Sequence, residues 1–340
     1  MGLTVALCFN LGQDFVPRDD EPPDLHCEFD SVSTIAAVTS ALEAAGHQVV
    51  KIEADDYAAA TLASLRPDIV FNMAEGLRGE SRESYIPAIC DALGIPYTGS
   101  GVLTLALSLD KAMAKRVFAF EGVATPPFRV IHPGQEIEAS GLCYPLFVKP
   151  LREGSSMGIT ERSRADDYEQ LREQVLRVTL GYRQPALVEE FLSGREFTVG
   201  LLGNDQVEFF PVMEINYAAV PQGHEVYSRH FKAEWSSWNY YLCPAPLSEL
   251  ELRRLQETAL AAYRAIGCRD FGRVDIRLDR AGLPCVMEIN PIPGLSPGFS
   301  DYPRMAEIGG YSHAQLVVAI LDQALERLAA QHVLAAARTG

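Results

Sequence analysis

Polar residues that could hold a metal ion and phosphate groups are spaced two apart within apolar segments near residues 272–290. Arg273 and Asp275 form one such pair, and Glu288 and Asn290 form the other. Because a β-strand points every second side chain to the same face, the members of each pair share a face. Turn-forming residues between them predict a hairpin that makes the two polar faces cross-strand neighbours. Such oxygen ligands suit Mg²⁺ bound together with substrate phosphates, and the competing interpretation is an ordinary charged surface hairpin.

A second segment, residues 149–158, is typical of a phosphate-binding loop. Lys149 ends a predicted strand over 144–149, and a loop rich in Gly and Ser, including Ser155, follows it. Backbone N–H groups of such a loop can surround phosphate oxygens, Gly permits positive φ, and the lysine adds a compact positive charge. The spacing is not that of a GxxxxGK[ST] loop. The alternative is a plain surface loop.

Nucleotide-binding chemistry could also be supplied by charged residues at the ends of predicted elements. Lys111 begins a predicted helix over 110–120, Glu189 and Glu190 end a predicted strand over 186–190, and Glu196 follows a Gly-containing turn. A base needs an acceptor for its exocyclic amine inside an apolar slot, and a ribose needs a carboxylate for its hydroxyl groups. Taken singly, the lysine would be solvated and each glutamate would be a surface charge.

The elements that must position these residues follow from hydrophobic periodicity. Strands at 3–9, 48–52 and 68–71 alternate with helices at 31–46 and 83–93. This alternation predicts a small open parallel sheet, with ligand residues at the carboxyl ends of its strands, near Asn10 and Asn72. Further helices are expected at 164–180, 248–266 and 312–331, with fraying after about 332.

Composition limits the classes of partner. The 340 residues suggest two or three domains, and a net charge of −16 argues against nucleic acid or an anionic membrane as partner. Seven cysteines lack metal-binding spacing, which favours reduced thiols in a cytoplasmic protein. No signal peptide is visible, and no apolar segment approaches the ~18 residues that span a bilayer.

Jointly, these motifs resemble the ATP-grasp superfamily and, within it, the D-alanine–D-alanine ligases. The resemblance covers nearly the whole chain and is densest in residues 97–101, 109–111, 148–156, 192–199, 272–275 and 288–290. It implies an α/β fold of three domains: an N-terminal domain with an open parallel sheet over 1–100, and central and C-terminal α+β domains over 101–192 and 193–340. ATP would be held between the last two, beneath a lid at about 215–245.

The resemblance also implies a role for individual residues. The residues that would hold ATP are Lys111 and Lys149 at the phosphates, Glu189, Glu190 and Leu192 at the base, Glu196 at the ribose, and Met287 as a further contact of the nucleotide. Those that would hold two Mg²⁺ ions, or Mn²⁺ in their place, are Asp275, Glu288 and Asn290. Arg273 would stabilise the oxyanion of the tetrahedral intermediate, Ser155 would orient the first substrate, Glu28 would receive its ammonium group, and Lys232 would reach the phosphates from the lid.

Departures from the family pattern concern the substrate. Lys232 is followed by Ala233 where the family has a tyrosine, and Phe299 and Ser300 stand in the register of its Ser-Leu pair, after Gly294, at the acceptor subsite. The first-domain turns carry a charged segment, 78–83, which would either contact a substrate or be solvated.

Three hypotheses follow. The first is a D-alanine–D-alanine ligase that works through an acyl phosphate, and the second is a ligase of the same mechanism for another pair of amino acids or small metabolites. The third is a catalytically silent nucleotide-binding protein. The expected partners are ATP and small amino acids, and the family suggests a homodimer.

Overall fold

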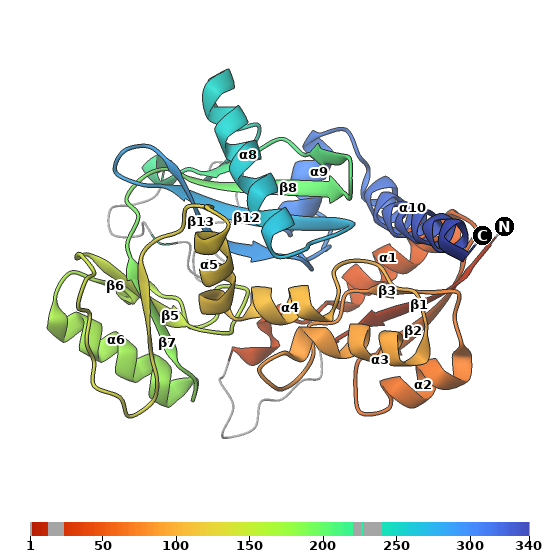
Figure 1. Ribbon diagram of the computed structural model, residues 1–340, viewed down its shortest axis with the longest axis horizontal. Helices are drawn as coiled ribbons and strands as arrows, with labels where there is room; N and C mark the ends of the chain where they lie inside the picture. Colours follow the sequence, from red (N-terminus) through yellow and green to blue (C-terminus); the bar gives the residue numbers. More distant parts are fainter. Residues whose placement is uncertain (1, 13–23, 220–225, 227–239, 340) are drawn as a thin grey trace.

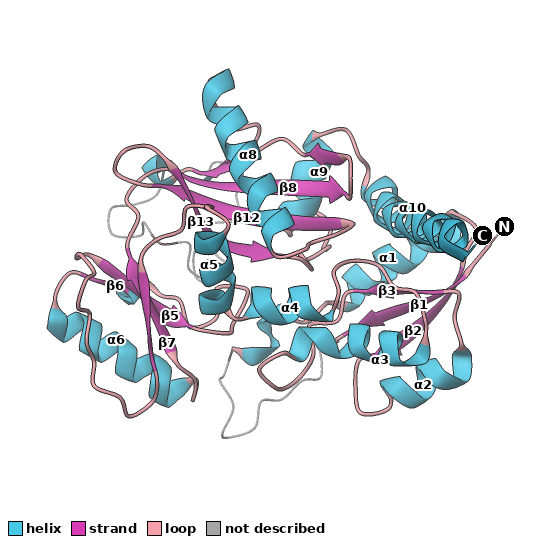
Figure 2. Ribbon diagram, viewed as in Figure 1, coloured by secondary structure: helices cyan, strands magenta, loops and turns pink. Residues whose placement is uncertain are grey.

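The structure is a computed structural model that describes residues 2–12, 24–219, 226 and 240–339. Within this part of the chain the strands form three sheets, each built from its own continuous segment (Figures 1 and 2). Helices α4 and α5 lie centrally between the sheets in Figure 1. None of the described helices combines the length and apolarity needed to cross a membrane.

The first sheet is parallel, as predicted, with the strand order β2-β1-β3. Its elements are β1 (Thr4–Phe9), α1 (Val32–Ala44), β2 (Gln48–Glu53), α2 (Ala58–Leu65), β3 (Ile69–Asn72) and α3 (Tyr85–Leu93). Ser31 begins α1 because its hydroxyl accepts the Thr34 N–H at 3.1 Å. The sheet is a three-stranded platform whose carboxyl-terminal edge faces the rest of the molecule (Figure 1).

The connection to the second sheet contains one helix that the sequence analysis missed. Helix α4 (Val102–Leu109) precedes α5 (Lys111–Phe120). The sequence of α4, VLTLALSL, has almost no polar face, so the helical period is hidden. Asp110 separates the two helices and caps α5, because its carboxylate accepts the Met113 N–H at 3.0 Å.

The second sheet is antiparallel, with the order β4-β7-β5-β6. Its elements are β4 (Phe128–Ile131), β5 (Leu146–Pro150), β6 (Arg164–Ala165), α6 (Tyr168–Gly181) and β7 (Ala186–Glu190). Helix α6 begins four residues later than the predicted 164 because Arg164 and Ala165 pair with β5 as an edge strand. Asp167 then caps the helix by accepting the Gln170 N–H at 2.9 Å.

The third sheet follows the order β11-β10-β8-β12-β13, with β9 paired to β8. Its elements are β8 (Glu196–Gly203), β9 (Val207–Phe209), β10 (Met213–Ile215), β11 (Tyr241–Leu242), α8 (Glu249–Ala265), β12 (Phe271–Leu278) and β13 (Pro284–Asn290). Val199 and Leu201 pack in one core with α8, whereas Leu202 joins the core on the opposite face. Strands β10 and β11 pair at Ile215 and Tyr241, so the two ends of the predicted lid lie side by side.

The last of the helices packs against the first sheet and α1, near the start of the chain. Helix α9 (Asp301–Ile308) is followed by α10 (His313–Thr339), which continues past the predicted end at 331. Leu316, Val317 and Ile320 of α10 share a core with Val5 and Val38 of the first sheet and α1. Both chain ends therefore lie together at one edge of the molecule (Figure 1).

Candidate active site

The β12–β13 hairpin places the predicted polar patch as expected. The antiparallel register pairs Arg273 with Asn290 and Asp275 with Glu288. A bulge then follows, because Ile276 is paired with Val286 and Met287 is left over. The bulge explains why the adjacent residues Met287 and Glu288 both line the same cavity, although a regular strand would point them to opposite faces.

Cations of the protein contact both carboxylates of this patch. The Arg273 guanidinium donates to Asp275 at 2.9 and 3.1 Å, and the Thr198 hydroxyl donates to the same carboxylate at 3.0 Å. Lys111 Nζ lies 3.4 Å from Glu288 Oε2. Burial alone would lower the pKa of Arg273, but the attraction of Asp275 and Asp301 raises it above its ordinary value. Arg273 therefore stays charged throughout the physiological pH range.

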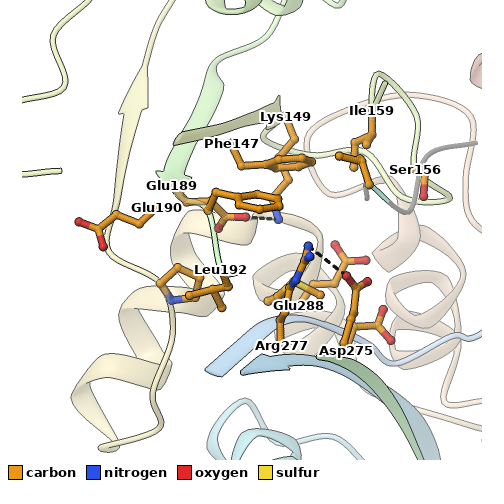
Figure 3. A pocket seen from close by; sticks show the side chains of 15 residues that line it. Phe147, Lys149, Ser156, Ile159, Glu189, Glu190, Leu192, Asp275, Arg277 and Glu288 are labelled. Atoms are coloured by element: carbon orange, nitrogen blue, oxygen red, sulfur yellow. Dashed lines mark ion pairs between the residues drawn. The ribbon is translucent and has the colours of Figure 1, made fainter. Parts of the chain in front are cut away.

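A cavity lies between the second and third sheets, and it collects most of the residues predicted to hold a nucleotide (Figure 3). Its empty space, including the solvent at its mouth, is about 690 Å³, within the usual size range of small-molecule sites. Phe147, Ile159 and Phe191 give it apolar walls. The predicted residues that line it are Lys149, Glu189, Glu190, Leu192, Glu196, Asp275, Met287 and Glu288.

Lys149 and Glu189 form a buried ion pair at the inner wall of this cavity, with Nζ 2.7 Å from Oε1 (Figure 3). The other carboxylate oxygen of Glu189 lies 2.8 Å from Lys115, a residue that the sequence analysis did not single out. Burial opposes the charge of each group, but the attraction within the cluster lowers the pKa of Glu189 and raises that of Lys149. Lys149 is therefore held in place and charged.

The carboxylate of Glu190 does not point into the cavity. It accepts the backbone N–H of Cys143 at 2.9 Å and points away from the cavity in Figure 3. Only the remainder of Glu190, with the neighbouring Leu192, is left to form the cavity wall. The alternation of a strand sends adjacent residues to opposite faces, so Glu189 and Glu190 could not both have pointed inward.

Glu196 is held by two residues that sequence reasoning missed. The Tyr217 hydroxyl donates to its carboxylate at 2.7 Å, and Arg277 Nη1 lies 3.3 Å from the same oxygen. The Arg277 guanidinium lies 4.6 Å from the ring centre of Phe191 and 5.0 Å from that of Tyr217. Arg277 continues the two-residue spacing of Arg273 and Asp275, and this signal could have identified it.

The loop after Lys149 adopts the positive φ values expected of a phosphate-binding loop, but not only at glycine. Ser155 and Ser156 have φ of 45° and 58°, and Gly158 has φ of 69°. Lys111 Nζ donates to the carbonyl of Glu153, and Ser156 lines the cavity. Left-handed backbone at two consecutive serines is strained, and such strain is found at functional loops.

Glu28 and Arg82, the latter from the charged segment 78–83, lie beside this loop rather than in solvent, whereas Arg78 and Glu80 of that segment are exposed. Glu28 accepts the Gly154 N–H at 2.5 Å and the Arg82 guanidinium at 2.7 Å, and Arg82 also contacts Glu153 at 3.1 Å. Both Glu28 and Arg82 are almost fully buried, so the solvated interpretation was wrong for Arg82. Burial and the nearby Glu28 outweigh the attraction of Arg82 and raise the pKa of Glu83 to about 7.

The remaining predicted residues lie in three places. Gly294 packs against Ser300, whose hydroxyl accepts the Ser296 N–H at 3.2 Å just before α9, and Phe299 is exposed. Lys232 lies outside the described residues, as does most of the predicted lid. Asn10 and Asn72 sit at strand ends as expected, but their side-chain oxygens accept the N–H groups of Gly76 and Ala74, so they shape the loop.

A family model described as "D-ala D-ala ligase C-terminus" matches residues 118–322. This chain belongs to the D-alanine–D-alanine ligase family. It is 36% identical to a D-alanine–D-alanine ligase of Mannheimia succiniciproducens, covering 86% of this chain and 92% of that protein. It is equally identical to an uncharacterized protein of Sinorhizobium fredii, covering 86% of this chain and 87% of the other.

Solved structures confirm the fold of this family member. The D-alanine–D-alanine ligase of Bacillus anthracis in complex with ATP aligns with a TM-score of 0.74 at 20% identity, over 96% of this chain and 98% of that one. The predicted ATP-grasp architecture, a parallel sheet followed by two further sheets, is therefore confirmed.

Proposed function

We propose that this protein is an ATP-dependent ligase that joins the carboxyl group of one amino acid to the amine of another through an acyl phosphate, with D-alanine as both substrates. The observation that carries the proposal is the position of the Arg273–Asp275 and Glu288–Asn290 faces at the edge of a cavity that holds Lys149 and Glu189. Family membership makes ATP the nucleotide to expect there.

ATP would occupy the cavity with its base against Leu192 and Met287, beside Glu189 and the backbone of Glu190. Glu196 would accept the ribose hydroxyl groups, since its carboxylate is fixed by Tyr217 and Arg277. The phosphates would extend toward Lys149, Lys111 and the strained loop at Ser155 and Ser156. The family resemblance suggests these assignments, and the lining of the cavity and the charges along it support them.

Asp275, Glu288 and Asn290 fit two Mg²⁺ ions, or Mn²⁺, as hard oxygen ligands on one face of the hairpin. Among the described residues no three His, Cys, Asp or Glu side chains gather as a protein-only metal site, so nucleotide phosphates would have to complete the coordination. When bound, the metal ions would neutralise phosphate charge during phosphoryl transfer.

The protein's own groups account for orientation and charge in the two steps. In the first, the donor carboxylate attacks the γ-phosphorus and ADP leaves, while Lys111 and Lys149 neutralise the phosphates. In the second, the acceptor amine attacks the acyl phosphate carbonyl and phosphate leaves. Negative charge develops on the carbonyl oxygen, where a preorganised Arg273 would stabilise it. Lys232 would reach the phosphates from the 215–245 lid, and the lid would exclude water, which hydrolyses acyl phosphates.

The donor would lie between the loop and the first sheet. Glu28 would receive its ammonium group and Ser155 would orient it, near the γ-phosphate. Because both oxygens of Glu28 already accept hydrogen bonds from Gly154 and Arg82, the ammonium would share this carboxylate with them. The acceptor carboxylate would bind in the turn of Gly294, Phe299 and Ser300.

We further propose the domain division 1–100, 101–192 and 193–340, because each sheet is contained within one of these segments. A cytoplasmic location and a homodimer are also proposals, and light scattering of the purified protein tests the dimer.

A second candidate is a ligase for a different acceptor. It is favoured by the acceptor turn, where the bulky Phe299 is exposed and Ser300 is half-buried. Both candidates are tested by incubating the purified protein with ATP, Mg²⁺ and single or paired amino acids. Phosphate release and the mass of the product are recorded.

Phosphate release with D-alanine alone, accompanied by its dipeptide, supports the first candidate. Release only with another pair supports the second. ATP binding without release across a broad panel contradicts both and leaves a silent nucleotide-binding protein.

A further inference from the structure

Lys115 is a fully buried cation beside the proposed nucleotide site that none of the roles above uses. It lies in α5, and its side chain has no exposed surface. Its Nζ lies 2.8 Å from Glu189 Oε2 and donates to Thr125 Oγ1 at 2.8 Å. The Phe128 ring is 5.8 Å away. Because Lys115 is enclosed on all sides, it can act on a nucleotide only through its neighbours.

One of these neighbours, Glu189, belongs to the second sheet. Glu189 is the penultimate residue of β7 and is bound between two lysines, with Lys115 behind it and Lys149 on the cavity side. A carboxylate with a single lysine partner would form a neutral pair. With two lysines, the cluster of Lys115, Glu189 and Lys149 carries one net positive charge, and this charge remains available to attract the phosphates of a nucleotide.

The other neighbour, Thr125, is hydrogen-bonded to the third sheet. The Thr125 hydroxyl donates to the carbonyl of Val286 at 2.8 Å, and the Val286 N–H donates to the carbonyl of Ala124 at 2.8 Å. Val286 is the residue of β13 directly before the bulge that turns Met287 and Glu288 into the cavity. The path Glu189–Lys115–Thr125–Val286 therefore joins the two walls of the cavity.

We propose that Lys115 is a positioning residue for the nucleotide: it sets Glu189 and Lys149 in place and, through Thr125, holds the wall formed by β7 against the wall formed by β13. This inference rests on the proposed binding of ATP in this cavity. Lys115 would touch neither substrate nor metal, yet it would control both the charge and the width of the nucleotide cavity.

The charge state of Lys115 supplies a readout that a purely structural residue would not give. The titratable groups that face it are Glu189 from β7, Lys149 from β5 and Cys285 from β13. Burial lowers the pKa of Lys115 most strongly, Glu189 opposes this effect, and Lys149 adds to it. As the pH rises, Lys115 should thus lose its proton earlier than an ordinary lysine, and the affinity for ATP should fall with it.

The test compares Lys115→Met and Thr125→Val with the wild type, and uses Arg116→Met as the matched control. Arg116 is the next residue of the same helix, is exposed, and loses the same charge when substituted. Binding of ATP with Mg²⁺ is measured by calorimetry without amino acids at pH 7 to 9.5, and KM values for ATP and for the amino acid are measured separately.

We expect Lys115→Met to weaken ATP binding about tenfold and to remove its decline at alkaline pH, because one net positive charge is lost. The KM of the amino acid should stay within about twofold. Thr125→Val keeps every charge and removes only the link to Val286. It should weaken ATP binding about threefold and keep the alkaline decline. Arg116→Met should match the wild type.

Wild-type ATP affinity in a folded Lys115→Met variant would overturn the inference. Should that variant not fold, Thr125→Val decides, and unchanged ATP binding in it rejects the link between the walls and the proposal with it. A wild type that binds ATP but forms no product contradicts the proposed ligase activity alone. A wild type that does not bind ATP contradicts both.

Discussion

Arg273 and Asp275 lie two residues apart on β12, and their side chains form a two-point ion pair, with Nη2 2.9 Å from Oδ2 and Nε 3.1 Å from Oδ1. The group proposed to stabilise the oxyanion is thus oriented by a group proposed to hold a metal ion. Because Thr198 also donates to Asp275, the carboxylate is fixed independently of the arginine. When Arg273 is substituted, the Asp275 carboxylate therefore still has the Thr198 hydroxyl to hold it in position.

Substitution Arg273→Ala should abolish most ligation while preserving ATP binding. Loss of one donor to a developing oxyanion typically lowers kcat by about 10²–10³-fold. The affinity for ATP, measured by calorimetry, should stay within about threefold, because Arg273 is not among the residues that line the cavity.

Arg254→Ala, an exposed arginine on α8, serves as the control and should retain wild-type activity. Retained turnover in Arg273→Ala would remove this residue from its assigned role.

Substitution Glu196→Gln should reduce the preference of the enzyme for ATP over analogues that lack a ribose hydroxyl group. The carboxylate is held in position by Tyr217 and Arg277, and it would accept hydrogen bonds from ribose hydroxyl groups. The KM for ATP should rise about tenfold, and the KM ratio of a deoxyribose analogue to ATP should fall toward 1. Steady-state kinetics with ATP and its 2′- and 3′-deoxy forms measure this ratio. An unchanged preference for ATP would show that Glu196 does not contact the sugar.

Substitution Glu83→Gln should change how stability depends on pH. The pKa of Glu83 is raised from 4.5 to about 7 in the folded protein, mainly by burial. A raised pKa means that the protonated form favours folding, and this contribution is lost as the pH rises through about 7. Glutamine resembles the protonated form, so the Tm of the variant relative to wild type should be about 2 °C or more higher at pH 8 than at pH 5.5.

Scanning calorimetry at the two pH values measures this difference. Glu257→Gln, an exposed glutamate on α8, is the control and should shift Tm equally at both. A pH-independent difference for Glu83→Gln would mean that Glu83 is charged in the folded protein at both pH values.

Substitution Arg327→Ala should destabilise the whole protein. Its guanidinium makes two contacts of 2.8 Å with the fully buried Asp270 and donates to the carbonyl of Tyr97 at 2.9 Å. Removing one partner of a buried ion pair leaves an uncompensated charge and typically costs about 3–5 kcal/mol. Urea unfolding measures the loss.

Arg162→Ala removes an exposed pair with Glu173 at 3.7 Å and should cost less than about 1 kcal/mol. Equal losses in the two variants would mean that burial of the Arg327–Asp270 pair does not matter for stability.

The sequence by itself determined the parts of this protein that depend on local periodicity. Arg273 and Asp275 lie on the same face because a strand has a two-residue repeat, and the start of α5 follows from the cap at Asp110. Family membership could also be inferred from motif order, since the segments around Lys149 and Glu288 occur at characteristic separations.

Only the tertiary structure decided which charges are satisfied and by which partners. Lys115 and Arg277 resemble ordinary charged residues in the sequence, yet one is enclosed behind Glu189 and the other lies against Phe191 and Tyr217. Likewise, Arg82 meets Glu28 and Glu153 across 54 and 71 residues. Burial and electrostatic attraction depend on distance in space, and no local repeat records which distant segments the packed core will bring together.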